Sequence, residues 1–411
     1  MSYLPRLVDG LLADLLTGLP AVLVVGPRAC GKTTTARQIT TAELRLDRPA
    51  DADLVRADPD TALRIRASPL LLDEWQLVPD VLGAVKRAVD DQPGNGRFVI
   101  TGSAQTDLTG AGWPLTGRAV RLAMWGLCER ELVGDPAAPS VLARVATVGV
   151  SALSYVADPP DLVSYIERAL RGGLPEVALA THPSLRRRRL AGYVDEVVAR
   201  EGAGVGTAAD PVRLRRYLQA WAANLACVVE HSTLYEAAGI NRLTAMSYDT
   251  LLASLLVVDP LPAWASNRIA RLAGRPKRHL VDPALVGPLL GVNAAGVLRD
   301  PVLLGALIES FTLAQLRPEL TLLDTPPHLF HVRDRDGRHE IDILIEYPDG
   351  RCLGIEVKAA ATATASDARH LSWLREHLGD RFLGGLVLHT GPHTFALGPD
   401  IMAAPIAALW S

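Results

Sequence analysis

The chain has 411 residues, with 42 lysines and arginines against 45 aspartates and glutamates. This length allows two or three domains with separate cores, and the near-balanced charge excludes a surface that is basic throughout, so any nucleic-acid surface would be local. The four scattered cysteines form no CxxC pair, and no basic leader or uncharged apolar run of about 20 residues is present. We therefore expect a cytoplasmic protein without a membrane segment.

The first 135 residues alternate predicted strands and helices. Residues 21–25 form an apolar run broken by Gly26, which is typical of a buried parallel strand that leads into a loop. Further short strands are predicted at residues 44–47, 70–73 and 97–101, with a helix over residues 81–90. This alternation predicts an α/β domain over residues 1–135, built on a doubly wound parallel sheet.

A GxxxxGK[ST] phosphate loop follows the first strand. In such loops backbone N–H groups surround the β-phosphate, the lysine reaches the β and γ oxygens, and the last hydroxyl binds magnesium. The motif here ends in Lys32 and Thr33, between an apolar strand and a helix; the alternative is a glycine turn that binds no nucleotide. The predicted ATP-binding residues are Gly26, Pro27, Arg28, Ala29, Cys30, Gly31, Lys32, Thr33 and Thr34.

The second half of this nucleotide site is predicted at the ends of later strands. Asp73 ends an apolar strand and would hold Mg²⁺ together with Thr33, while Glu74 would polarise the attacking water. Ser103 follows the next strand and could contact the γ-phosphate. Arg118 is a candidate arginine finger, within one chain or across subunits, although a surface salt bridge accounts for it equally well.

The middle region, residues 150–295, has helical apolar spacing. Four consecutive arginines, 186–189, flank one predicted helix and are interpreted as a solvated face. Residues 233–238 and 243–256 have the lengths of a helix-turn-helix around Gly239, with two possible wing strands after it. Because such pairs are common packing modules and the second helix has few basic residues, DNA binding here is one of two open interpretations.

The last region, residues 296–411, is predicted to be α/β with a central hairpin. A three-residue turn at 348–350 would pair Tyr347 with Arg351 and place Asp342 opposite Glu356. Glu356 and Lys358 are two apart on a strand and share a face. Such a group could bind Mg²⁺ through Glu309, Asp342 and Glu356, with Lys358 stabilising a phosphate; an ion-paired hairpin without catalysis is the alternative.

In their order along the chain, these segments resemble a widespread group of bacterial and archaeal AAA+-type ATPases. The resemblance rests on the phosphate loop, Asp73–Gln76, residues 101–103, 117–118 and 171–176, and later on residues 275–282 and 340–358. It implies an N-terminal AAA domain and a C-terminal domain of unknown function with a PD-(D/E)XK nuclease-like fold.

Two functions of different class follow. In the first, a magnesium-dependent ATPase controls cleavage or binding of nucleic acid by its own C-terminal domain. In the second, the chain is an ATP-driven switch or binding module whose nuclease-like fold does not cleave. ATP and Mg²⁺ are the expected cofactors, nucleic acid and a second copy of the chain are possible partners, and no membrane partner is expected.

Overall fold

The computed structural model describes residues 3–102, 114–153, 155–201, 210–334 and 338–411. The chain divides into two compact units. The first comprises residues 1–127 with Ser254–Leu256, and the second comprises Cys128–Ala253 with Val257–Ser411.

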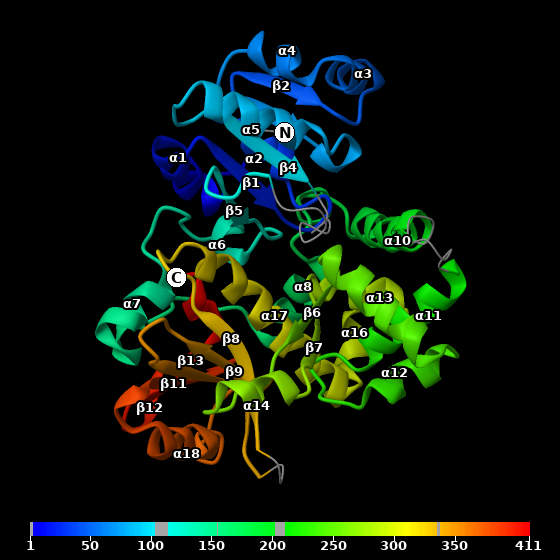
Figure 1. Ribbon diagram of the computed structural model, residues 1–411. Helices are drawn as coiled ribbons and strands as arrows, with labels where there is room; N and C mark the ends of the chain where they lie inside the picture. The colour runs from blue at the N-terminus through cyan, green and yellow to red at the C-terminus, as the bar shows by residue number, and fades with distance from the viewer. Residues whose placement is uncertain (1–2, 103–113, 154, 202–209, 335–337) are drawn as a thin grey trace. The chain divides into compact units, whose positions relative to one another are not determined.

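The first unit is built on a five-stranded parallel sheet with strand order β2-β3-β4-β1-β5 (Figure 1). The strands are β1 (Ala21–Val25), β2 (Ala42–Arg45), β3 (Leu70–Asp73), β4 (Phe98–Gly102) and β5 (Ala119–Ala123). The helices are α1 (Val8–Gly18), α2 (Lys32–Ala36), α3 (Pro49–Ala57), α4 (Pro59–Arg64) and α5 (Val81–Asp91), with a 3-10 turn at Trp75–Leu77.

Two hydrophobic clusters lie on opposite faces of this sheet. One joins α1 and α2 to alternate strand residues such as Val22 and Val24. The other joins α3, α4 and α5 to the intervening residues, such as Leu23 and Leu72. Helices therefore cover both faces, as predicted. Because the strands are parallel, their carboxyl ends all lie on the same side of the sheet.

The predicted strands at 21–25 and 70–73 are confirmed residue for residue, and those at 44–47 and 97–101 are displaced by one or two residues. Strand β5 was not predicted, because Val120 and Arg121 are exposed and the segment shows no apolar run. Ser103 lies outside the described residues, so its predicted role remains a prediction.

The N-terminal part of the second unit is helical. Helices α12 (His231–Ala238) and α13 (Arg242–Ser254) lie on either side of Gly239, whose φ is 66°, close to the helix bounds predicted for a helix-turn-helix. Strands β6 (Val258–Leu261) and β7 (Lys277–Leu280) then pair antiparallel. The helices are α6 (Glu129–Leu132), α7 (Val141–Val148), α8 (Leu162–Arg171), α9 (Pro175–Ala178), α10 (Pro183–Glu201), α11 (Pro211–Ala223), α12 (His231–Ala238), α13 (Arg242–Ser254), α14 (Arg268–Ala273), α15 (Val286–Leu290) and α16 (Ala294–Leu298), with 3-10 turns at Val150–Ala152 and Pro283–Leu285.

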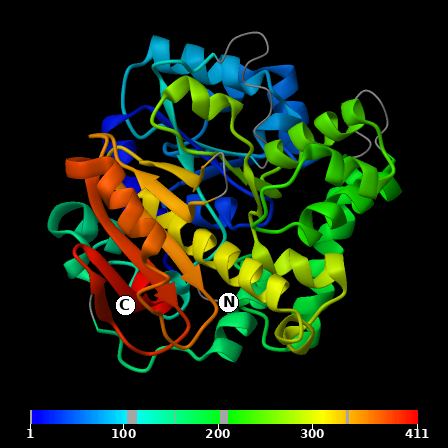
Figure 2. The ribbon, with the colours of Figure 1, turned by 90° about the horizontal axis from the view of Figure 1, so that it is seen from below.

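The C-terminal part contains a six-stranded mixed sheet with strand order β12-β13-β11-β10-β9-β8. Helix α18 (Arg369–Leu378) lies across this sheet in Figure 2. The side chains of Leu371 and Leu374 lie close to Gly354 of β10 (Cys352–Lys358). The elements are α17 (Pro301–Thr321), β8 (His328–Arg333), β9 (Glu340–Glu346), β10 (Cys352–Lys358), α18 (Arg369–Leu378), β11 (Phe382–His389), β12 (Phe395–Gly398) and β13 (Ile401–Pro405), with 3-10 turns at Gly379–Arg381 and Ile406–Leu409.

The central hairpin has the register that the three-residue turn predicts. The N–H of Tyr347 donates to the carbonyl of Arg351 at 2.8 Å, and Gly350 takes the left-handed conformation with φ of 83°. The β9–β10 ladder continues to Ile343, which pairs with Ile355. Beyond that pair, the carboxylate of Asp342 accepts a hydrogen bond from the N–H of Val357 at 2.9 Å.

Candidate functional site

The phosphate loop connects β1 to α2 and is held by close backbone contacts. A Cβ on Gly26 would lie 2.0 Å from the carbonyl oxygen of Met124, so only glycine fits there without a shift of the backbone. The buried guanidinium of Arg6 donates to the carbonyl of Cys30 at 2.9 Å and to that of Trp125 at 2.8 Å. Arg6 therefore ties the loop to the segment after β5, a role with no sequence motif.

Lys32 is buried, and its ammonium lies inside the loop. It donates to the carbonyl oxygens of Gly26 at 2.9 Å and Pro27 at 2.8 Å. Two neutral carbonyls satisfy hydrogen bonds but leave the positive charge without an anionic partner among these contacts. Phosphate oxygens would supply that negative charge, which is the role predicted for Lys32.

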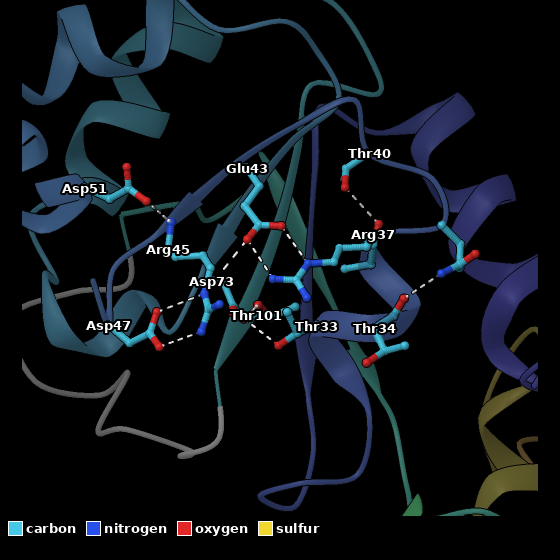
Figure 3. A network of polar contacts seen from close by, with 12 residues as sticks. Thr33, Thr34, Arg37, Thr40, Glu43, Arg45, Asp47, Asp51, Asp73 and Thr101 are labelled. Atoms are coloured by element: carbon cyan, nitrogen blue, oxygen red, sulfur yellow. Dashed lines mark hydrogen bonds and ion pairs between the residues drawn. The ribbon is translucent and has the colours of Figure 1, made fainter. Parts of the chain in front are cut away.

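Asp73 joins the loop to two neighbouring strands (Figure 3). Its Oδ1 accepts hydrogen bonds from the hydroxyls of Thr33 at 2.7 Å and Thr101 at 2.6 Å. Asp73 and Thr101 are partners in the parallel ladder, so the sheet register fixes their proximity. A carboxylate and a hydroxyl are oxygen donors of the kind that Mg²⁺ prefers, so Thr33 and Asp73 fit the magnesium role predicted for them.

Glu74 follows β3 with φ of 57°, and its carboxylate accepts a hydrogen bond from the side-chain amide of Gln76. Trp75 and Gln76 pack against Gly102 at the end of β4, where a Cβ would lie 2.6 Å from the indole nitrogen. Gln76 is thus a direct partner of the predicted catalytic glutamate, and its role was not predicted.

A row of charged residues on β2 and just after α2 and β2 lies beside Asp73 in Figure 3. Arg37 binds Glu43 through two hydrogen bonds of 2.6 and 2.7 Å, and Arg45 binds Asp47 at 3.2 and 2.7 Å. Arg45 is the ladder partner of Asp73. Hydrogen bonding to Arg37 holds the pKa of Glu43 below its ordinary value, so this acid stays ionised.

Arg118 lies where the strands of this sheet begin, at the end opposite to the phosphate loop. It immediately precedes β5, whose first residue, Ala119, pairs with Ala21 at the start of β1, whereas the phosphate loop follows the end of β1. Its guanidinium binds Asp90 at 2.6 and 2.9 Å. The strand length separates Arg118 from the loop by roughly 15 Å. The structure therefore places Arg118 away from the phosphate loop of its own chain, which favours a role across subunits, and the arginine finger remains a prediction.

A second group of charged residues is buried in the second unit, around Lys277 of β7. The side chain of Lys277 is 2% exposed, and its ammonium lies 2.8 Å from Glu309 of α17 and 2.9 Å from Asp342 of β9. Glu340 lies 3.7 Å from the same ammonium. Lys358 pairs with Glu356 at 3.0 Å. The sequence analysis predicted the acids and Lys358 but not the role of Lys277.

Burial and mutual repulsion perturb these acids strongly. Burial, with the nearby charge of Asp342, raises the pKa of Glu309 to about 8 and that of Glu356 to about 8. Burial also opposes ionisation of Asp342, but Lys277 and the Val357 N–H outweigh it and hold the pKa of Asp342 below its ordinary value. Around neutral pH Glu309 and Glu356 are therefore at least partly protonated.

The three carboxylates do not form the predicted magnesium site. Among the residues that the structure describes, no group of three histidine, cysteine, aspartate or glutamate side chains is arranged to hold a metal ion. One oxygen of Asp342 contacts Lys277, and the other accepts the Val357 N–H. Lys277 thus lies between Asp342 and Glu309, where the sequence analysis placed the metal.

Three protein families match successive parts of the chain. Residues 19–133 match an AAA domain, residues 162–296 match a domain of unknown function (DUF8612), and residues 304–409 match another (DUF4143). The first match covers the phosphate loop, Asp73 and Glu74. Residues 19–133 are therefore similar to an AAA domain, which supports the predicted P-loop ATPase.

The chain is also similar to two curated proteins and one solved structure. The uncharacterized proteins Rv2008c of Mycobacterium tuberculosis and Mb2031c of Mycobacterium bovis are each 29% identical over 391 residues, covering 94% of this chain and 80% of the relative. The Walker-type ATPase PABY2304 of Pyrococcus abyssi aligns with a TM-score of 0.42 and 14% identity, covering 69% of this chain and 94% of its own. In the described part of the chain, no helix is long and apolar enough to cross a membrane.

The contact between Gly26 and Met124 gives a test of the loop geometry. Gly26→Ala should weaken ATP binding at least roughly tenfold, since the added methyl group must displace backbone that carries the phosphate-binding N–H groups. Gly10→Ala in α1 is the matched control, because a Cβ there meets nothing within 4 Å. Fluorescent-ATP titration measures both; unchanged affinity in Gly26→Ala would contradict the argument.

The raised pKa of Glu309 predicts a pH dependence of stability. Between its ordinary 4.5 and about 8, the folded protein holds a proton that the unfolded chain has released, so this contribution is lost as pH rises through that window. Glu309→Gln cannot titrate and should flatten the slope of unfolding free energy between pH 5 and 8, measured by urea denaturation. Exposed Glu376→Gln serves as control, and an unaltered slope in Glu309→Gln would refute the assignment.

Proposed function

We propose that the protein binds ATP with Mg²⁺ in its first unit and hydrolyses it. The observation that carries this proposal is the joining of Thr33, Asp73 and Thr101 beside the buried Lys32. These four residues, from α2, β3 and β4, lie together where the parallel strands end, inside a region that matches an AAA domain. A glycine turn without a ligand would not require a lysine buried against its own carbonyls.

Each residue has a distinct role in the proposed reaction. Backbone N–H groups of the loop and the ammonium of Lys32 bind the phosphates, and Thr33 and Asp73 would hold the magnesium ion, which offsets charge on the β and γ oxygens. Glu74 orients the attacking water and accepts its proton. In this structure one oxygen of the Glu74 carboxylate accepts a hydrogen bond from the Gln76 amide, so Gln76 would hold the carboxylate while its other oxygen binds the water.

For the second unit we propose a binding or switching role in place of nucleic-acid cleavage. Asp342, Glu356 and Lys358 are all present, which motivates the nuclease alternative. The contacts of Lys277 favour the non-cleaving alternative, because they engage two of the three acids that a metal would need. Nucleic acid and a second copy of the chain remain proposed partners for this unit and for the ATPase cycle.

The roles of Lys32 and Glu74 differ and can be separated. Lys32→Ala should abolish tight ATP binding, since the ammonium contacts phosphate in the ground state. Glu74→Gln should bind ATP normally and lose turnover, because a neutral amide cannot accept the proton from water. Equilibrium binding and phosphate release measure the two steps. Equal turnover by Glu74→Gln and the unmodified protein would remove Glu74 from the reaction.

The trans role of Arg118 can be tested by mixing two inactive variants. Arg118→Ala should lower kcat by at least roughly tenfold with little change in ATP affinity, because an arginine finger acts on charge that develops in the transition state. Mixing it with Lys32→Ala should restore turnover, since some sites then combine an intact Lys32 with an intact Arg118 of another chain. Full activity of Arg118→Ala alone, or no recovery on mixing, would leave Arg118 as a partner of Asp90 only.

A further inference from the structure

Lys277 is one of only four lysines in the chain and is more deeply buried than Lys32. It lies on β7, its ammonium contacts one residue of α17 and one of β9, and at 1% exposure the residue has almost no access to solvent. An ammonium in such a place is unfavourable unless it is paired. Here two carboxylates from two different elements converge on it.

The groups around Lys277 balance the positive charge of its ammonium. The ammonium lies within 3 Å of Glu309 and Asp342, and 3.7 Å from Glu340. His279, two residues on along β7, is fully buried and lies 3.7 Å from Glu309. Burial and the positive charge of Lys277 lower the pKa of His279 well below its ordinary value, so the imidazole is neutral and adds no second cation.

A further acid lies beside this group with one oxygen unused. Glu356 is 3% exposed; its Oε2 binds Lys358, whereas its Oε1 is buried and has no hydrogen-bond partner in the described structure. The charge of Asp342 contributes to raising the pKa of Glu356, which places the two acids within electrostatic reach. Without Lys277, the acids Glu309, Asp342 and Glu356 would form a buried group of oxygen donors lacking its main counter-charge.

We propose that Lys277 is a resident cation that occupies the position a divalent metal ion would otherwise take, and that it thereby keeps this site metal-free. A lysine covalently held at the site is present at every moment, whereas an ion must compete for it from solution. Hard divalent cations bind clusters of carboxylate oxygens, so removal of the ammonium should let these acids turn toward the vacated position and form a metal site there. The inference is independent of ATP hydrolysis in the first unit.

The test uses the full chain without nucleotide and Mn²⁺ as the probe, with free Mn²⁺ measured by electron paramagnetic resonance. The unmodified protein should bind no Mn²⁺ that depends on Asp342. Lys277→Met, which keeps the unbranched side chain and removes the charge, should gain one Mn²⁺ equivalent and should be stabilised by Mn²⁺ in thermal unfolding. Adding Asp342→Asn to Lys277→Met should abolish both effects. Lys86→Met, at an exposed position of α5, is the matched control and should gain nothing.

Two results would overturn the proposal. One is Mn²⁺ binding by the unmodified protein that is lost in Asp342→Asn; the other is a folded Lys277→Met that binds no Mn²⁺. If Lys277→Met does not fold, Fe²⁺-dependent backbone cleavage of the unmodified protein still decides the question. Cleavage near residues 342 and 356 would place a metal there and refute the inference, whereas protection of this region would support it.

Discussion

A buried charge must be paired or hydrogen-bonded, and this constraint organises both charged sites in the chain. Removing one partner of a buried ion pair typically costs about 3–5 kcal/mol, which is a large share of the stability of a domain. Lys32 meets the constraint with carbonyls of its own loop, and Lys277 meets it with Glu309 and Asp342. The difference is chemical: carbonyls leave the charge of Lys32 available to an anion, whereas carboxylates neutralise Lys277. One lysine is therefore arranged for a ligand and the other is already occupied.

The arrangement of the proposed nucleotide site could be predicted from the sequence because its parts are local or tied by a parallel register. The loop, its strand and its helix are contiguous, and Asp73 and Thr101 each end a short strand at the same sheet edge. Arg118 shows where this reasoning stops. The half-exposed strand β5 has no apolar run, so the local sequence does not indicate that a strand begins after Arg118. Without that strand, the position of Arg118 at the starting end of the sheet cannot be predicted. Gln76 and Arg6 were missed because their partners follow from backbone geometry that has no residue signature.

The pairing register of the C-terminal hairpin was predictable, because proline and glycine in a three-residue turn favour one register. The site built on it was not. Lys277 precedes Glu309 by 32 residues and Asp342 by 65, and no periodicity or motif links positions so far apart. One signal was present: the chain has only four lysines, and the one at 277 lies in a segment where arginine supplies the other positive charges, so it stands out against the composition.

The position of Lys277 also bears on how the second unit is organised. It falls in the region matched by one family, residues 162–296, while Glu309 and Asp342 fall in the region matched by another, residues 304–409. A boundary near residue 295 therefore separates two families but would cut through one buried ion-paired group. Separating the two parts would expose an uncompensated lysine on one side and repelling acids on the other. The pairing is one of the interactions that join these two parts within a single compact unit. A displacement of the β6–β7 ribbon would therefore change the charge environment of the acids on α17 and β9.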